Sequence, residues 1–319
     1  MRHGSLSIGI LAIAIACGLL ANAAPARAAA ETWVSGTGTN AGNCPVTAPC
    51  KTFQFAHNKT NANGSINVLS AGSFGPLTIT KPISIVADGV EAAILGGGAI
   101  GAGIKIQSGA GDSVSLRGLT IDLLGTVNIG VSFLSGAALH VHNSVIRGTT
   151  DGISFVPASG TSELTVADSV IANSSSRGIR VDPTGSAGAK VVLDRVRVEN
   201  APFSNFGIII TGVSTSGSIT ATVRDSVVAG NGSAIIGIVA SESGSGTTNV
   251  MIDRSASVDN TTGIQATNAG ATIQIGDSMV TRNSTGLKPF SGGVINSYGT
   301  NKVDGNTSDG AATNIIPMR

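Results

Sequence analysis

Aromatic and charged residues are both scarce in this sequence. Its 319 residues include 8 Phe, one Trp and one Tyr, so the core must be built mainly from aliphatic side chains. Charged residues make up 12% of the chain, and the formal net charge is +1. Such a chain lacks the basic surface that attracts nucleic acids or anionic lipids. We therefore expect neither as a partner.

Long apolar runs are absent after the N-terminal segment. Residues 1–28 combine a basic start, an apolar run from about Leu6 to Leu20 and the small-residue site Ala26-Arg27-Ala28, a pattern typical of a secretory signal peptide. No later segment approaches the roughly 18 apolar residues that a membrane span needs. The sequence predicts an exported protein, periplasmic or extracellular, without a membrane span. The stretch "AIAC" leaves one alternative, a lipoprotein anchored through Cys17.

Cysteine is rare as well, with three residues in the chain. Removal of residues 1–28 leaves Cys44 and Cys50, a close pair in an exported chain, and this predicts one disulfide. A zinc site is disfavoured because only His57 stands nearby, which leaves the ligand set incomplete. We expect no metal and no cofactor.

Glycine and β-branched residues are abundant, and they recur in a repeat. Gly accounts for 44 residues, and the mixture with Val, Ile, Thr and Asn favours short strands joined by tight turns. Segments such as "LHVHNSVI" (139–146), "LTVADSVI" (164–171) and "ATVRDSVV" (221–228) align with one another. Each is followed by a second element that begins with a glycine, at Gly130, Gly152, Gly178, Gly207, Gly237, Gly263 and Gly286. Steps of 22 to 30 residues between these glycines indicate a solenoid.

The alternation of side chains within each element predicts two stacked aliphatic ladders. The first follows the glycines and contains Val131, Ile153, Ile179, Ile208, Ile238, Ile264 and Leu287. The second contains Leu116, Val141, Val166, Leu193, Val223, Ile252 and Ile275. Because no stretch after residue 60 has a convincing helical period, we expect an all-β fold, a right-handed single-stranded parallel β-helix.

A row of asparagines marks the turns after the strand pairs. Asn tolerates a left-handed backbone and bonds to neighbouring chain segments, so we expect an amide ladder from one coil to the next. Its expected members are Asn173, Asn200, Asn231, Asn260, Asn283 and Asn306.

The N-terminal end of the coil stack needs a cap, because an unpaired strand edge invites association with another chain. The segment "APCKTFQFAHNKT" (48–60) is the best helical candidate outside the signal segment. The predicted organisation is a signal peptide at 1–28, a cap segment with a short helix and the disulfide at 29–60, and β-helix coils with a polar C-terminal end coil at 61–319.

The opening "PCKTFQFA…GSINVLSAGSFGPLTITKPISI" is similar to the "KTIQ-A…G-I-V-GTY-E-I-K" opening of many pectin-lyase-like proteins, and the Gly-Ile coils fit their repeat. The chain thus resembles the pectin-lyase-like superfamily of right-handed parallel β-helices over nearly all of its mature length. It also resembles short secreted bacterial β-helix proteins of unknown function. The superfamily includes polysaccharide lyases, hydrolases and esterases, so the resemblance implies the fold and offers motifs to test, but it does not imply a function.

The catalytic motifs of that superfamily are not recognisable in this sequence. Asn-Thr-Asp, Asp-Asp and Gly-His-Gly motifs are absent, and "GIRVD" places Asp182 where a related motif has lysine. The outward row of the Gly-Ile strands has no carboxylates on adjacent coils, whereas glycoside hydrolysis needs two carboxyl groups at short range. We therefore expect no catalytic residue.

The sequence favours a structural or binding role, in contact with an extracellular glycan or a surface protein. The expected binding face follows the outward side of the Gly-Ile strands, with Ser132, Ser154, Arg180, Asp182 and Gln265. The alternative is a polysaccharide lyase or hydrolase with an atypical site, for which Arg180, Asp182, Arg195 and Arg197 are the first candidates. Asp194, Arg224 and Asp253 alternate in sign on successive coils and predict a surface ion-pair ladder.

Overall fold

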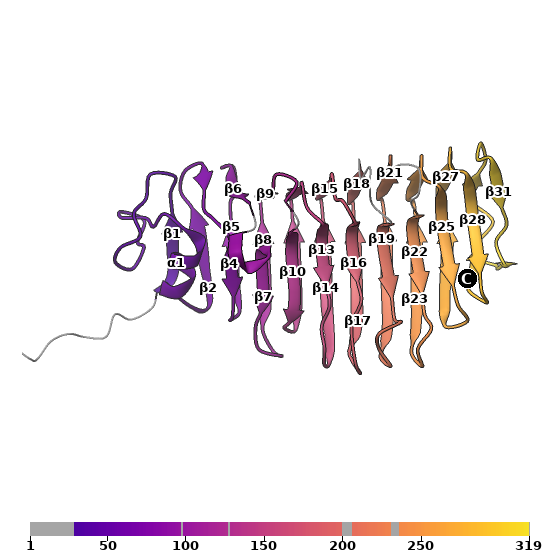
Figure 1. Ribbon diagram of the computed structural model, residues 1–319, viewed down its shortest axis with the longest axis horizontal. Coiled ribbons are helices and arrows are strands. Elements are labelled where there is room, and N and C mark those ends of the chain that lie inside the picture. The colour runs from indigo at the N-terminus through magenta and orange to yellow at the C-terminus, as the bar shows by residue number, and fades with distance from the viewer. Residues whose placement is uncertain (1–28, 97, 127, 200–205, 231–235, 319) are drawn as a thin grey trace, which may run out of the picture.

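The computed structural model describes residues 29–96, 98–126, 128–199, 206–230 and 236–318. The chain winds into a single elongated stack of coils (Figure 1). Each coil contributes one strand to each of three parallel sheets, which we call sheets A, B and C in chain order. The predicted parallel β-helix is thereby confirmed. The predicted signal peptide and the alternative lipid anchor at Cys17 lie outside the described residues.

Sheet A has twelve strands and follows the stack from end to end. Its strands are β1 (Ala29–Val34), β2 (Thr60–Val68), β5 (Ile83–Val86), β8 (Ser113–Arg117), β11 (Ala138–His142), β14 (Thr161–Ala167), β17 (Gly188–Asp194), β20 (Ser218–Arg224), β23 (Thr247–Asp253), β26 (Ala271–Gly276), β29 (Val294–Ser297) and β32 (Asn314–Ile315). The first of these strands lies within the segment predicted as the cap.

Sheet B has ten short strands that follow a tight corner after sheet A. They are β3 (Gly72–Ser73), β6 (Ala92–Leu95), β9 (Leu119–Asp122), β12 (Val145–Arg147), β15 (Val170–Ala172), β18 (Arg197–Glu199), β21 (Val227–Ala229), β24 (Ala256–Val258), β27 (Met279–Thr281) and β30 (Lys302–Val303).

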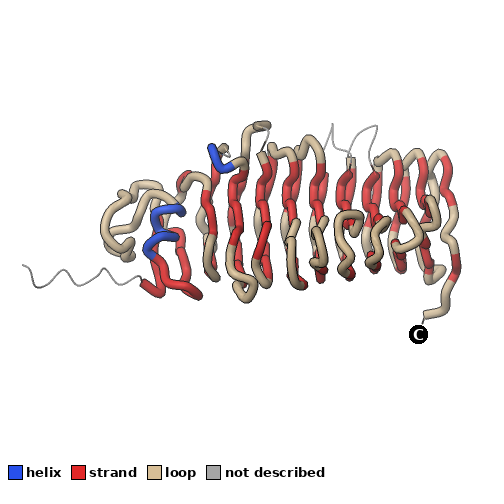
Figure 2. The backbone as a smooth tube through the Cα atoms, turned by 60° about the horizontal axis from the view of Figure 1, so that its bottom comes forward, coloured by secondary structure: helices blue, strands red, loops and turns tan. Residues whose placement is uncertain are grey.

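Sheet C has ten strands as well and carries the Gly-Ile elements. They are β4 (Leu77–Ile79), β7 (Ala102–Gln107), β10 (Ile129–Ser135), β13 (Asp151–Phe155), β16 (Arg177–Val181), β19 (Phe206–Thr211), β22 (Ile236–Ser241), β25 (Thr262–Thr267), β28 (Thr285–Phe290) and β31 (Ser308–Gly310). Two short helices, α1 (Phe53–Lys59) and the 3-10 turn η1 (Gly98–Ile100), lie toward the N-terminal end of the stack (Figure 2).

Both predicted aliphatic ladders form the core. In sheet C, Ile153 pairs with Val131 on one side and with Ile179 on the other, and each is fully buried. In sheet A, Val166 lies between Val141 and Leu193 in the same way. Burial of each such side chain contributes about 1.5–3 kcal/mol relative to exposure. The repeated stacking of these side chains is therefore the main source of stability.

The glycines before the sheet C ladder are needed because the coils approach closely at the corner with sheet B. A Cβ atom on Gly178 would lie 2.3 Å from Cγ1 of Val198 and 2.6 Å from the carbonyl oxygen of Gly207 in the next coil. Gly152 meets Ile171 and Gly178 in the same way. The Gly-Ile pattern therefore records a steric requirement that recurs in each coil.

Within the described residues, the asparagine ladder forms among Asn260, Asn283 and Asn306 at the C-terminal end. The backbone N–H of Asn260 donates to Oδ1 of Asn283, and that of Asn283 donates to Oδ1 of Asn306, each at 2.9 Å. The prediction is wrong for Asn173, which is exposed and left-handed (φ 52°). Ser174 takes the inward place there and bonds to Thr149 at 3.1 Å. Asn200 and Asn231 lie outside the described residues.

The N-terminal end is closed by the predicted helix and disulfide. Cys44 and Cys50 are bonded and buried, and their backbones bond to Trp33 of β1 at 2.7 and 2.8 Å. Helix α1 begins after Thr52, whose hydroxyl accepts from the N–H of Phe55, an N-cap that satisfies an otherwise free donor. Phe53 packs against Phe74 with ring centroids 4.9 Å apart, which fixes the helix on the first coils.

Replacement of Gly178 by alanine (G178A) tests the steric requirement at the corner. The added methyl group forces apart two coils, and overpacking of this kind costs about 1–3 kcal/mol. We expect a lower midpoint of urea denaturation. Gly111→Ala is the matched control, because a Cβ there meets no atom within 4 Å. Equal midpoints for the two variants would contradict the role assigned to the corner glycines.

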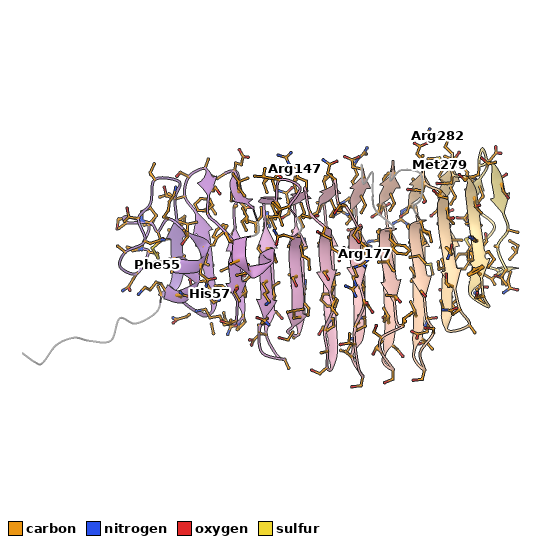
Figure 3. All side chains as sticks on the ribbon, in the orientation of Figure 1. Phe55, His57, Arg147, Arg177, Met279 and Arg282 are labelled. Atoms are coloured by element: carbon orange, nitrogen blue, oxygen red, sulfur yellow. A yellow bond between two sulfur atoms is a disulfide. The ribbon has the colours of Figure 1, made fainter. Side chains whose placement is uncertain are left out.

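A second prediction concerns His57, which lies on α1 at the N-terminal end (Figure 3) and is buried. Its Nε2 atom accepts from the N–H of Thr80 at 3.4 Å. Burial lowers the pKa of His57, and the charge of Lys81 lowers it further. Below the ordinary histidine value of 6.5, the opened cap therefore binds a proton that the closed cap excludes. The stability of the cap is fully present above that pH and is lost as the pH falls.

The measurement for His57 is amide hydrogen exchange of residues 53–59, corrected for the intrinsic rates, at about pH 8 and about pH 5. We expect the cap to open more readily at the lower pH in the wild-type protein. His57→Gln, which cannot gain the proton, should abolish that pH dependence. The same dependence in both proteins would show that another group causes it.

Candidate functional site

A groove lies on the outer face of sheet A at its C-terminal end. It has a volume of about 810 Å³. Its floor is formed by Thr222, Met251 and Gln274, which are paired across β20, β23 and β26. Because strand side chains alternate, these residues point outward while Val223, Ile252 and Ile275 fill the core.

The floor of the groove offers hydrogen-bonding groups without partners of their own. The side chains of Thr222 and Gln274 are partly exposed and form no hydrogen bond with any other described residue. The thioether of Met251 between them supplies an adaptable apolar contact. The floor can therefore contact a ligand that has both apolar surface and hydroxyl groups.

One side of the groove is lined by members of two neighbouring columns of charge, namely Arg224, Asp253, Arg254 and Asp277. The first column is the predicted outward row of sheet A, and its members Asp194, Arg224 and Asp253 lie in register on adjacent strands. Nε of Arg224 lies 3.0 Å from Oδ1 of Asp194, as the predicted ladder requires. Asp253, however, pairs with Arg254 of the second column.

The second column occupies the turn between sheets A and B. Asp168, Arg195, Asp225, Arg254 and Asp277 all have left-handed backbones, with φ between 44° and 52°. Their signs alternate along the column and are opposite to those of the first column within the doublets Asp194-Arg195, Arg224-Asp225 and Asp253-Arg254. We call the two columns together the charge checkerboard.

A ladder of serines holds these left-handed turns in place. The N–H of Ser226 donates to the hydroxyl of Ser255 at 3.2 Å, and the N–H of Ser255 donates to that of Ser278 at 3.1 Å. Each hydroxyl in turn donates to the carbonyl two residues before it, as Ser226 does to Arg224 at 2.7 Å. These bonds satisfy buried donors that the turn would otherwise leave unpaired.

Most charges of the checkerboard are neutralised by their neighbours. Asp168 accepts from Nε and Nη2 of Arg195, one coil later, at 2.6 and 2.9 Å. Asp225 accepts from the same two atoms of Arg254 at 2.9 and 3.0 Å. Hydrogen bonds from Arg254 lower the pKa of Asp225, and hydrogen bonds to Asp225 raise the pKa of Arg254.

Tyr298 lies at the C-terminal end of the groove and depends on a glycine for its position. A Cβ atom on Gly276 would lie 3.2 Å from Cδ2 of Tyr298 and 3.9 Å from Oδ1 of Asp253. The absence of a side chain at Gly276 therefore lets the tyrosine ring lie beside the checkerboard. Sequence reasoning placed Tyr298 at the end of the chain and assigned it no site. One sequence feature could have indicated this site, because Gly276 interrupts the charged row of Asp194, Arg224 and Asp253.

The C-terminal segment completes the lining of the groove. The N–H of Ile316 donates to the carbonyl of Ser297 at 2.9 Å, which fixes the segment beside β29. Pro317 and Met318 follow, and both are exposed while also lining the groove. A shallower depression of about 330 Å³ adjoins the groove toward the N-terminus and shares Thr222, Met251 and Gln274 with it.

The predicted binding face on sheet C is largely covered. Ser132, Ser154 and Arg180 lie in one row as expected, but Ser132 and Ser154 are only 6% and 3% exposed. Asp182 pairs with Arg180. Oδ1 of Asp182 and Oε1 of Gln265 are buried without a hydrogen-bond partner in the described structure. These residues offer little surface to a large ligand, and binding there stays a prediction.

The residues suspected for an atypical enzyme site do not come together. Arg180 and Asp182 lie at the outer side of sheet C, Arg195 lies at the turn between sheets A and B, and Arg197 begins β18 and pairs with Glu199. Burial raises the pKa of Asp151, which begins β13 and pairs with Arg177 (labelled in Figure 3). That carboxyl group belongs to sheet C and lies outside the groove.

Within the described residues, no three His, Cys, Asp or Glu side chains gather closely enough to hold a metal ion. None of the helices described here is long and apolar enough to cross a lipid bilayer.

Comparison with solved structures identifies the fold. The chain is similar to the structure titled "Crystal structure of pectate lyase Pel9A", with a TM-score of 0.62 and 14% sequence identity over 89% of this chain and 79% of that chain. The protein therefore has the pectin-lyase-like parallel β-helix fold. No protein-family model matches the sequence, and no curated protein sequence is similar to it.

Replacement of Arg254 by glutamine (R254Q) tests the charge checkerboard. Loss of its two hydrogen bonds should raise the pKa of Asp225 toward the ordinary value of 3.8, while Arg224 and Arg195 keep it partly lowered. The measurement is a carboxyl carbon NMR titration. Arg282→Gln is the matched control, because Arg282 pairs with Asp259 at another corner and is seen beside Met279 in Figure 3. The control should shift Asp259 alone. An unchanged Asp225 in R254Q would refute the pairing.

Proposed function

We propose that this protein is exported and binds a linear, uncharged polysaccharide along the outer face of sheet A without cleaving it. The observation that carries the proposal is the groove, in which a tyrosine ring, unpaired hydroxyl and amide groups and a wall of paired charges occur together. An amphipathic aromatic ring offers an apolar face to the ring of a sugar, and the floor groups are suited to its hydroxyls.

The charge pattern of the groove supports an uncharged ligand. Acidic glycans are usually held by arginines that form paired hydrogen bonds with their carboxylates. In this groove Arg224 and Arg254 are already bound to Asp194 and Asp225. Release of Arg254 for a ligand would leave Asp225 and Asp253 without their salt-bridge partner, so an acidic glycan gains little.

Two further observations support the wider proposal. The similar structure is titled as a pectate lyase, a name that concerns a polysaccharide, and the Cys44–Cys50 disulfide is typical of oxidising compartments outside the cytosol. Asp253 is paired with Arg254 in a salt bridge, and this pairing supports a binding role without catalysis. A polysaccharide lyase or hydrolase with an atypical site is the competing function.

Glycan binding by variants of Tyr298 tests the proposal. Purified protein of residues 29–319 is titrated with pullulan, mixed-linkage β-glucan and laminarin as uncharged glycans, and with polygalacturonate and alginate as acidic ones. We expect binding to at least one uncharged glycan and a rise in Kd of about tenfold, or about 1.4 kcal/mol, in Tyr298→Ala. Tyr298→Phe should retain most of the affinity, because the ring remains.

Phe290→Ala is the matched control, since Phe290 is 51% exposed on sheet C and does not line the groove. The same samples are assayed for new reducing ends and for unsaturated products. Turnover that disappears in Asp253→Asn or Asp277→Asn would replace the binding function with the enzymatic one. The proposal fails if no uncharged glycan binds, or if binding is indifferent to Tyr298.

A further inference from the structure

The groove differs at its two ends, and the difference bears on which part of a glycan chain it can hold. Toward the N-terminus it continues into the shallower depression, which is lined as far as Lys190 and Val192 of β17. Successive strands of a sheet are about 4.8 Å apart, so the path from β17 to β29 crosses four such steps, or about 19 Å. A linear ligand can follow this path perpendicular to the strands.

The segment after the last strand of sheet A bounds the C-terminal end of the same path. β32 is the last strand of sheet A, and the segment Ile316–Met318 directly after it lines the groove together with Tyr298. Met318 is 68% exposed, so it stands at the rim instead of packing into the core. The bond from Ile316 to Ser297 and the restricted backbone of Pro317 limit how far this segment can move.

From this asymmetry we infer that the groove holds the end of a glycan chain, with the terminal sugar against Tyr298 and the rest of the chain leading toward β17. The inference rests on the proposed function and adds a requirement for a free chain end. A chain that passed through the groove would have to cross Pro317 and Met318. A chain that ends at Tyr298 meets the aromatic ring and the hydroxyl of Thr300 and needs no exit.

The chemistry of the C-terminal end of the groove suits a terminal sugar. A terminal unit exposes one hydroxyl group more than an internal unit, because one of its oxygens is free of a glycosidic bond. Asp277 stands at this end, is exposed and forms no salt bridge with another described residue. Its N–H donates to the hydroxyl of Thr300 at 2.9 Å, which brings the two polar residues together beside Tyr298. Both can accept the hydrogen bond of the additional hydroxyl.

The number of protein molecules bound per glycan chain tests the inference. The probes are size fractions of unbranched uncharged glycans, pullulan and mixed-linkage β-glucan, which have one non-reducing end per chain at every length, and the measurement is sedimentation of the complexes at saturating protein. We expect the wild-type stoichiometry to stay constant per chain as the chains lengthen. The double variant Pro317→Gly/Met318→Gly, which lowers the C-terminal end of the groove, should instead bind in numbers that grow with chain length. Ile315→Ser is the matched control, because Ile315 is exposed on β32 and does not line the groove.

The possible outcomes separate this inference from the proposed function. Wild-type protein that binds in proportion to chain length, with affinity that still depends on Tyr298, would overturn end recognition and leave glycan binding intact. A double variant that keeps the constant stoichiometry of the wild type would also overturn it. If no glycan binding depends on Tyr298, the proposed function itself is wrong, and end recognition is wrong with it. Circular dichroism of both variants checks that the coils remain folded.

Discussion

The coil-to-coil hydrogen bonding of three parallel sheets is the constraint on which the other features of this protein depend. Each strand pairs with the strand one coil later in the chain, and equivalent positions lie opposite one another through the stack. A side chain therefore always has a counterpart in the next coil at nearly fixed spacing. Side chains that point inward form the aliphatic ladders, and side chains that point outward form columns of polar or charged groups on the surface. The fold turns a periodic sequence into extended surfaces, and the candidate site is a local departure from that regularity.

The core could be predicted from the sequence because it follows the period of the repeat. Alternation within each segment placed Ile153 and Val166 inside, and the structure confirms both. The Gly-Ile signature was visible as well, although its cause is a contact with the neighbouring coil that sequence alone does not reveal. Asn173 was misplaced because the turn has one outward and one inward position side by side. Asparagine suits both, through its tolerance of left-handed backbone and through its amide group.

The groove could not be predicted, since it arises where the repeat stops. Its floor comes from regular outward positions. Its C-terminal end comes from the segment after β32 and from Tyr298, which places a ring one coil after Gly276 in the first charge column. Gly276 occupies a place where the three preceding coils carry charge, and this exception makes room for the ring. The charged doublets were visible in the sequence, yet their neutralisation depends on both columns, and only one was recognised. The predicted face on sheet C has the expected register, but Ser132 and Ser154 are buried. Alternation predicts which side of a strand a residue faces, and it does not predict whether other parts of the chain cover that side.

The charge checkerboard has a period of two coils, whereas the backbone has a period of one. Loss or duplication of the single coil that carries Arg224 and Asp225 would leave the hydrogen-bonded ladders of the backbone continuous, but it would bring like charges into adjacent rungs of both columns. Loss or gain of two coils would restore the alternation. Lengthening of this stack by tandem duplication is therefore easiest when coils are added two at a time, because an even number of added coils preserves the alternation of charge on its flank.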